Sequence, residues 1–272
     1  MRLVDSHCHL QADRFGGDVD LVVGAARLAG VERILVPGWD VASSERALDL
    51  VARFPWLEAA VGVHPHDAAA VDDAGWERVV ELAADARVMA IGETGLDFDR
   101  MFSPVDAQLS NLRRNLALAR ATAKPAIVHC RSKLGARDAQ DALLEEFARA
   151  GIVGGSTPAR PAAIIHSYSG PADYGEAVIA LGLAVSFSGL VFRPGEEASA
   201  DVVRLVPPDR LLVETDSPFL SPPGAPRKRN EPEWVAVTAR WVAERRGVEP
   251  EALGADLVAA YDATVRRPAD ST

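Results

Sequence analysis

The sequence lacks long apolar runs and has no excess of positive charge. No stretch of about 18 consecutive apolar residues is present, and residues 1–10 show no basic segment followed by an apolar one. We therefore expect neither a membrane span nor a signal peptide, and we expect a cytoplasmic protein. The net charge of −10 argues against broad electrostatic attraction to nucleic acid, because such binding depends on neutralising phosphates. A polyanion would have to be attracted by metal ions and local basic residues.

Cysteine is nearly absent from the chain. Only Cys8 and Cys130 are present, and they form no CxxC pair. Each stands next to a histidine, and successive side chains of a β-strand point to opposite faces. We therefore expect both thiols to point away from any site that the histidines build, and to pack in the core.

Hydrophobic residues make up 48% of the 272 residues, which is enough to bury a large core. Short apolar runs recur along the chain with helical patterns between them, and no linker or low-complexity stretch divides them. The predicted strands are residues 3–7, 33–37, 58–63, 88–92, 126–129, 163–166, 184–187 and 210–214. We interpret residues 1–272 as one domain.

The segments between the predicted strands carry apolar residues with the spacing of amphipathic helices, as in DVDLVVGAARLAGV, SNLRRNLALARATAK and DALLEEFARAG. Alternating strands and helices predict a parallel sheet of the α/β class. The number of units favours a closed TIM (β/α)8 barrel, although an open, doubly wound sheet has the same periodicity. Residues 154–161 are interpreted as a loop before the sixth strand.

Histidines gather at the ends of the predicted strands. His7 and His9 are two positions apart, so both imidazoles of a strand would lie on one face and could clamp a metal ion. Active sites of TIM barrels lie at the C-terminal ends of the strands. The candidate site residues in such positions are His7, His9, His64, Glu93, His129, His166 and Asp216. The remaining histidine, His66, fits a polar loop residue equally well.

These donors exceed the four ligands of one structural zinc ion, so we infer a site for two divalent ions. The expected ligands are His7, His9, Glu93, His129, His166 and Asp216. Glu93 comes from the middle of the set and would bridge the ions. Asp216 would bind metal, orient the attacking water and accept its proton. The mixed donors suit Zn, Mn, Co or Fe and, less well, Mg.

The sequence around these residues resembles the TatD family of metal-dependent hydrolases and deoxyribonucleases. The matching stretches are DSHCHL at 5–10, GVHPH at 62–66, GETGLDF at 92–98, KPAIVHCR at 124–131, HSYSG at 166–170, and ETDSPFL at 214–220 with RKRNEP at 227–232. The resemblance implies a TIM barrel, metal ligation by the same set of residues, and hydrolysis of DNA phosphodiester bonds, often from the 3′ end. Thr94, the pair at 167–168, the loop at 154–161 and the C-terminal stretch 256–272 depart from the family pattern.

A phosphodiester substrate also needs positive charge to hold its flanking phosphates. Arg131 lies two residues past the histidine of the fifth strand, and Arg227, Lys228 and Arg229 form a basic run after the last strand. His64 could reach a phosphate oxygen. We therefore expect His64, Arg131, Arg227 and Arg229 to bind substrate.

Aromatic residues in the loops could stack on the bases of a single strand. Trp39, Phe98 and Phe192 are the candidates, and packing is an equal alternative for each. We expect single-stranded DNA or 3′ ends as the partner, no membrane association, and a monomer.

Two other functions stay open. The same metal site could hydrolyse another ester or amide, such as D-aminoacyl-tRNA, because the residues around the metals select the substrate. A non-enzymatic metal-binding protein would need no open coordination position and no substrate groove.

Overall fold

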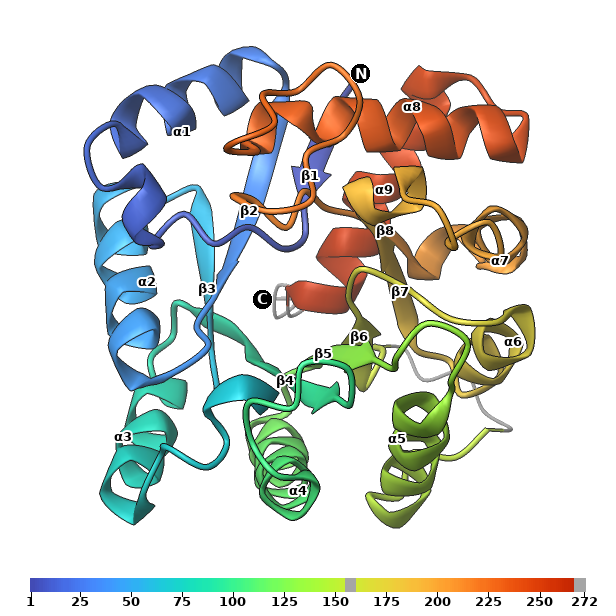
Figure 1. Ribbon diagram of the computed structural model, residues 1–272. Helices are drawn as coiled ribbons and strands as arrows, with labels where there is room; N and C mark the ends of the chain where they lie inside the picture. Colours follow the sequence, from blue (N-terminus) through green and yellow to red (C-terminus); the bar gives the residue numbers. More distant parts are fainter. Residues whose placement is uncertain (155–159, 267–272) are drawn as a thin grey trace, which may run out of the picture.

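The computed structural model describes residues 1–154 and 160–266, in which eight parallel strands form one sheet in chain order (Figure 1). The strands are β1 (Leu3–Asp5), β2 (Val31–Pro37), β3 (Leu57–Val61), β4 (Val88–Asp97), β5 (Ala126–Arg131), β6 (Ala163–Ile165), β7 (Ala184–Phe187) and β8 (Leu211–Val213). An open, doubly wound sheet would reverse its strand order at one point. The strict order from β1 to β8 therefore confirms the predicted TIM barrel.

Helices cover the outside of the ring of strands in Figure 1. The α-helices are α1 (Val19–Leu28), α2 (Val41–Arg53), α3 (Asp73–Ala83), α4 (Val105–Thr122), α5 (Asp138–Arg149), α6 (Ala172–Ala180), α7 (Ser199–Leu205), α8 (Val235–Arg246) and α9 (Pro250–Val265). Short 3-10 helices lie at Asp13–Phe15, Pro65–Asp67, Gly189–Phe192, Pro208–Arg210 and Pro232–Trp234. Among the described residues, none of the helices combines the length and the apolar character that crossing a bilayer requires.

The first and last strands meet at a seam that closes the barrel. The backbone N–H of Ser6 donates to the carbonyl of Val213 over 3.0 Å, and the N–H of Asp216 donates to the carbonyl of His7 over 2.9 Å. These bonds bring residues from opposite ends of the sequence to the same mouth of the barrel. Both cysteines belong to the apolar core, as predicted.

Strands β4 and β5 are longer than predicted. Their pairing continues from Thr94 opposite Val128 to Asp97 opposite Arg131. The prediction that the two strands end at residues 92 and 129 was therefore wrong, because apolar periodicity does not reveal a ladder that continues through polar residues. Glu93 consequently lies within β4 rather than at its end.

The opposite error occurred at β1, β6 and β8. β1 ends at Asp5 and β6 ends at Ile165, so His7 and His166 follow their strands instead of belonging to them. β8 is also shorter than the predicted segment 210–214. The backbone leaves the ladder at these positions, and the side chains of His7 and His166 both contact the carboxylate of Glu93.

Gly95 allows β4 to approach β5 closely. Its φ of +135° favours glycine, and a Cβ at this position would collide with the carbonyl oxygen of His129. Gly95→Ala should therefore lower the free energy of unfolding by about 2 kcal/mol or more, measured by urea denaturation. Gly24→Ala, in α1 with open space around it, is the control and should leave the stability unchanged or raise it. Equal midpoints for the two variants would refute this role of Gly95.

Helix α9 covers the N-terminal end of the barrel and contacts β1 and β8. The hydroxyl of Tyr261 donates to the carboxylate of Glu58 over 2.6 Å, and Arg266 forms an ion pair with the same carboxylate at 3.1 Å. The unusual C-terminal stretch therefore docks on the barrel as far as residue 266. Residues 155–159 of the predicted loop and residues 267–272 lie outside the described residues.

Candidate metal centre

A cavity of about 1360 Å³ opens at the C-terminal ends of the strands. The predicted site residues that line it are His9, His64, Glu93, His129, Arg131, His166 and Asp216. His7 is fully buried beneath them. Residues separated by more than 200 positions in the chain thus share one cavity.

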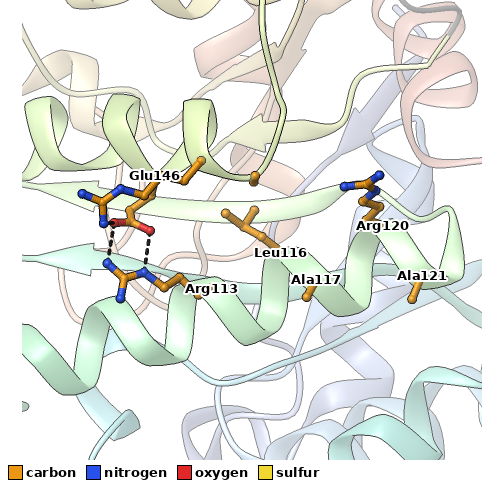
Figure 2. A pocket seen from close by; sticks show the side chains of 8 residues that line it. Arg113, Leu116, Ala117, Arg120, Ala121 and Glu146 are labelled. Carbon is orange, nitrogen blue, oxygen red and sulfur yellow. Dashed lines mark hydrogen bonds and ion pairs between the residues drawn. The ribbon is translucent and has the colours of Figure 1, made fainter.

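A second cavity, of about 530 Å³, lies on the outer surface between α4 and α5. Figure 2 shows an ion pair at one end of this cavity, in which Arg113 donates to both oxygens of Glu146 over 2.7 and 2.8 Å. Arg149 donates to the same carboxylate over 2.9 Å. This cavity contains no histidine, and its carboxylate is already neutralised, so it is not the candidate metal centre.

The first donor group surrounds the Oε2 atom of Glu93. The Nε2 atoms of His7 and His9 lie 3.2 and 3.4 Å from this oxygen and 3.1 Å from each other. The Oδ1 atom of Asp216 is 3.7 Å from His7 Nε2 and 3.5 Å from His9 Nε2. Two nitrogens and two carboxylates therefore converge on one point.

The second donor group surrounds the other oxygen of the same carboxylate. Glu93 Oε1 lies 3.2 Å from His64 Nε2, 3.3 Å from His129 Nδ1 and 3.0 Å from His166 Nε2. His129 Nδ1 is also 3.3 Å from His166 Nε2. Glu93 thus faces one donor group with each oxygen.

The electrostatics of this cluster favour a bound cation. Burial opposes ionisation of Glu93, but the imidazoles of His64, His166 and His7 outweigh it and hold the pKa of Glu93 well below its usual value. Burial likewise opposes protonation of His9, yet hydrogen bonds to Asp216 and Glu93 raise its pKa to about 9. The carboxylates therefore stabilise positive charge here.

Two of the imidazoles stay neutral in this environment. Burial lowers the pKa of His64 to about 4, and burial together with the neighbouring His166 lowers the pKa of His7. A neutral imidazole offers a lone pair, which a metal ligand requires. The donor set of nitrogens and carboxylate oxygens therefore fits divalent transition-metal ions.

Local structure fixes the directions of these side chains. His9 donates from Nδ1 to the carbonyl of Pro37 over 3.2 Å, which leaves its Nε2 facing Glu93. Asp216 has a φ of +53°, a left-handed conformation that aspartate adopts more readily than most residues. This turn directs the Asp216 carboxylate toward the first donor group.

Two buried carboxylates behind the donors were missed by the sequence interpretation. Asp97 accepts a hydrogen bond from His66 Nε2 over 2.7 Å and lies 3.4 Å from His129 Nε2. Glu214 accepts a hydrogen bond from His166 Nδ1 over 3.0 Å. Despite burial, His166 lowers the pKa of Glu214 to about 2. The sequence could have indicated both residues, because Asp97 lies in GETGLDF at 92–98 and Glu214 lies in ETDSPFL at 214–220, two of the stretches that match the family.

Asp97 should act by orienting His129, since ligand imidazoles commonly donate their second N–H to a carboxylate. We expect Asp97→Asn to weaken metal affinity by about 10- to 100-fold, measured by competition with a chelating dye. Asp99→Asn is the control, because Asp99 pairs with Arg131 at 2.8 Å rather than with a histidine. Unchanged metal affinity in the Asp97 variant would contradict this role.

The predicted substrate-binding residues lie in different parts of the structure. His64 joins the second donor group, and Arg131 lines the cavity while paired with Asp99. Arg229 forms ion pairs with Asp18 at 2.8 Å and Glu231 at 2.6 Å, and it does not line the cavity. Arg227 does not line the cavity either. Arg229 therefore pairs with carboxylates outside the cavity, and substrate binding by Arg227 and Arg229 stays a prediction.

Other basic and aromatic side chains occupy the cavity wall instead. The basic residues that line it, besides Arg131, are Arg46, Arg100, Lys133, Arg137 and Arg193. Among the aromatic candidates, Trp39 lines the cavity, whereas Phe98 packs against the core and Phe192 packs on Trp241. Phe102 and Phe219 line the cavity and were not predicted.

A parallel barrel with imidazole and carboxylate donors buried at the C-terminal ends of its strands defines a metal-dependent hydrolase. The family described as TatD related DNase matches residues 4–263. The chain belongs to this family, and it is an enzyme that hydrolyses ester bonds.

Relatives and solved structures agree with this assignment. The "Uncharacterized metal-dependent hydrolase YabD" of Bacillus subtilis is 36% identical, covering 89% of this chain and 90% of the relative. The "3'-5' ssDNA/RNA exonuclease TatD" of Erwinia billingiae is 35% identical, covering 98% and 100%. Among solved structures, the crystal structure of YJJV, a TatD homologue from Escherichia coli K12, superimposes with a TM-score of 0.83. The two sequences are 26% identical, and the match covers 98% of this chain and 99% of YJJV.

Proposed function

We propose that this enzyme is a deoxyribonuclease that removes nucleotides from 3′ ends with a pair of divalent cations. The observation that carries the proposal is the position of Glu93 between two donor groups, each facing one of its oxygens. A carboxylate placed in this way can bridge two ions about 3.5 to 4 Å apart. The relatives named 3'-5' ssDNA/RNA exonuclease support the substrate class.

We assign one cation to the first donor group and the other to the second, with Glu93 shared. The proposed ligands are His7, His9, Glu93, His129, His166 and Asp216, with His64 beside the second cation. When bound, Zn, Mn or Mg would polarise the phosphodiester and lower the pKa of the water that attacks phosphorus.

Asp216 is the proposed general base. Its side chain is 14% exposed and lines the cavity, whereas that of Glu93 is 4% exposed. Three imidazoles surround one oxygen of Glu93 and keep it ionised, so Glu93 orients ligands rather than exchanging protons. Asp216 can accept the proton of the attacking water from the open side of the first donor group.

Basic side chains in the cavity wall would hold the phosphates next to the scissile bond. Arg46, Arg100, Lys133 and Arg193 line the cavity, and within the described residues none of them forms an ion pair. Their charge is therefore available to a ligand. This local charge can attract DNA although the net charge of the chain is −10.

The proposal is tested with metal-stripped protein reconstituted with Zn, Mn or Mg. Single-stranded oligonucleotides labelled at the 3′ or the 5′ end are the substrates. Release of a labelled mononucleotide from the 3′ label, and a ladder from the 5′ label, are expected. Metal analysis should give two ions per chain. Cleavage of D-aminoacyl-tRNA but not of DNA with any ion would overturn the proposal.

A further inference from the structure

The segment RKRNEP at 227–232 lies outside the cavity, yet it contacts the loops that form the cavity wall. Arg229 donates to the carbonyl of Arg14 over 3.0 Å and to the carboxylate of Asp18 over 2.8 and 2.9 Å. Its guanidinium also lies 5.2 Å from the ring centre of Phe15. Arg229 therefore fastens this segment to the loop that follows β1.

Asn230 fastens the same segment to the turn that follows β8. This residue is fully buried, and its side-chain amide donates to the carbonyl of Thr215 over 2.9 Å. Its backbone N–H donates to the carbonyl of Pro218 over 3.1 Å, and the N–H of Phe219 donates to the carbonyl of Asp216 over 2.8 Å. The turn from Thr215 to Phe219 is thus held at both ends.

Phe219 is an exposed aromatic residue on this fixed turn. Its side chain lines the cavity although the residue is 48% exposed, and its ring centre lies 6.2 Å from that of His9. The guanidinium of Arg14 lies over the ring at 5.4 Å, and Arg14 does not line the cavity. Arg14 therefore contacts Phe219 from outside the cavity, while about half of the residue stays exposed.

Trp39 lies on another side of the same histidine. Its ring centre is 5.2 Å from that of His9, and it also lines the cavity. Trp39 is half-buried and Phe219 is exposed, and accessible aromatic side chains in a concave wall usually mark a ligand site. Both rings are in contact with His9, whose Nε2 lies 3.4 Å from Glu93. A group stacked on either ring would lie next to the metal centre.

We propose that Phe219, with Trp39 beside it, is the stacking platform for the unpaired nucleobase that adjoins the scissile phosphodiester, and that Arg229 and Asn230 position this platform. The proposal rests on the proposed nuclease function. Aromatic rings stack on any base, so the platform selects unpaired strands rather than a sequence. A base inside a duplex is already stacked on both faces and must leave the helix to reach Phe219.

The experiment compares kcat and KM of the metal-loaded enzyme on two single-stranded oligonucleotides. One is unmodified, and the other has abasic residues at its last two 3′ positions. Phe219→Ala should raise KM for the unmodified oligonucleotide by about 10- to 100-fold, with little change in kcat. The variant and the wild type should have similar KM values for the abasic oligonucleotide, because no base is left to stack.

Two further variants separate stacking from general damage. Phe219→Leu keeps an apolar side chain without the ring. This variant should lose most of the difference in KM between the unmodified and the abasic oligonucleotide. Phe54→Leu is the matched control, because Phe54 directly follows α2 and does not line the cavity, and this variant should keep wild-type values. Arg229→Ala should reduce the preference for the unmodified oligonucleotide while metal content stays the same, which is the result expected of a positioning residue.

The outcomes distinguish this inference from the proposed function. Equal losses on both oligonucleotides in the Phe219 variants would overturn the platform but leave the nuclease intact. A wild-type enzyme that cleaves both oligonucleotides with the same KM would also overturn it. Failure of the wild-type enzyme to cleave either oligonucleotide would overturn both proposals.

Discussion

Glu93→Gln should reduce phosphodiester hydrolysis by about 10³-fold or more and should lower the metal content below two ions per chain. The amide keeps the shape of the side chain but removes the charge that faces both donor groups. One end of an amide also carries N–H donors, which cannot bind a cation. Steady-state kinetics and metal analysis on the same preparation measure both effects.

Glu196→Gln provides the control for this substitution. Glu196 lines the same cavity and accepts a hydrogen bond from Ser169 over 2.9 Å, but it contacts none of the donor histidines in the described structure. Its replacement should preserve metal content and most of the activity. A Glu93 variant that binds two ions and retains more than about a tenth of the activity would contradict the bridging role.

Asp216→Asn should lower kcat by about 10²- to 10⁴-fold, the usual contribution of a general base. The backbone bonds that hold the turn should survive, because they use the Asp216 N–H and carbonyl rather than the carboxylate. We therefore expect a melting temperature close to that of the wild-type metal-free protein. Kinetics and thermal denaturation monitored by circular dichroism test the two statements.

Asp13→Asn is the matched control, because Asp13 lines the cavity but belongs to neither donor group. It should leave kcat within a few-fold of wild type. An Asp216 variant with more than about a tenth of the wild-type kcat would exclude the general-base role. A large fall in its melting temperature would instead assign the carboxylate a structural role.

The convergence of the predicted ligands could be anticipated from sequence because their positions depend on local periodicity. Apolar runs locate the strands of a barrel, and the chemistry of this fold gathers at one end of them. His7, His129 and His166 therefore converge even though all three strand ends were misplaced, each by one or two residues. A misplaced strand end of this size shifts a residue along the strand direction, but the residue still lies at the C-terminal end of the barrel.

The cavity wall could not be predicted in the same way. Side-chain directions in loops depend on contacts with distant segments, and no periodicity encodes these contacts. Arg229 pairs with Asp18, more than 200 positions earlier in the chain, and does not line the cavity. Phe219 lines the cavity on a turn that is hydrogen-bonded to Asn230, which lies 11 positions later in the chain. Phe192, an equally plausible stacking residue in the sequence, packs on Trp241 instead.

The sequence by itself determined the alternation of strands and helices, the candidate donor residues near the strand ends, and the end of a parallel barrel at which they would meet. Strand and helix periods are properties of neighbouring residues, and closure of a parallel barrel then fixes which ends lie together. Only the tertiary structure decided that each oxygen of Glu93 faces its own group of imidazoles, and which basic and aromatic side chains line the cavity. These features depend on packing between segments far apart in the chain, where a shift of about 1 Å decides whether two groups interact.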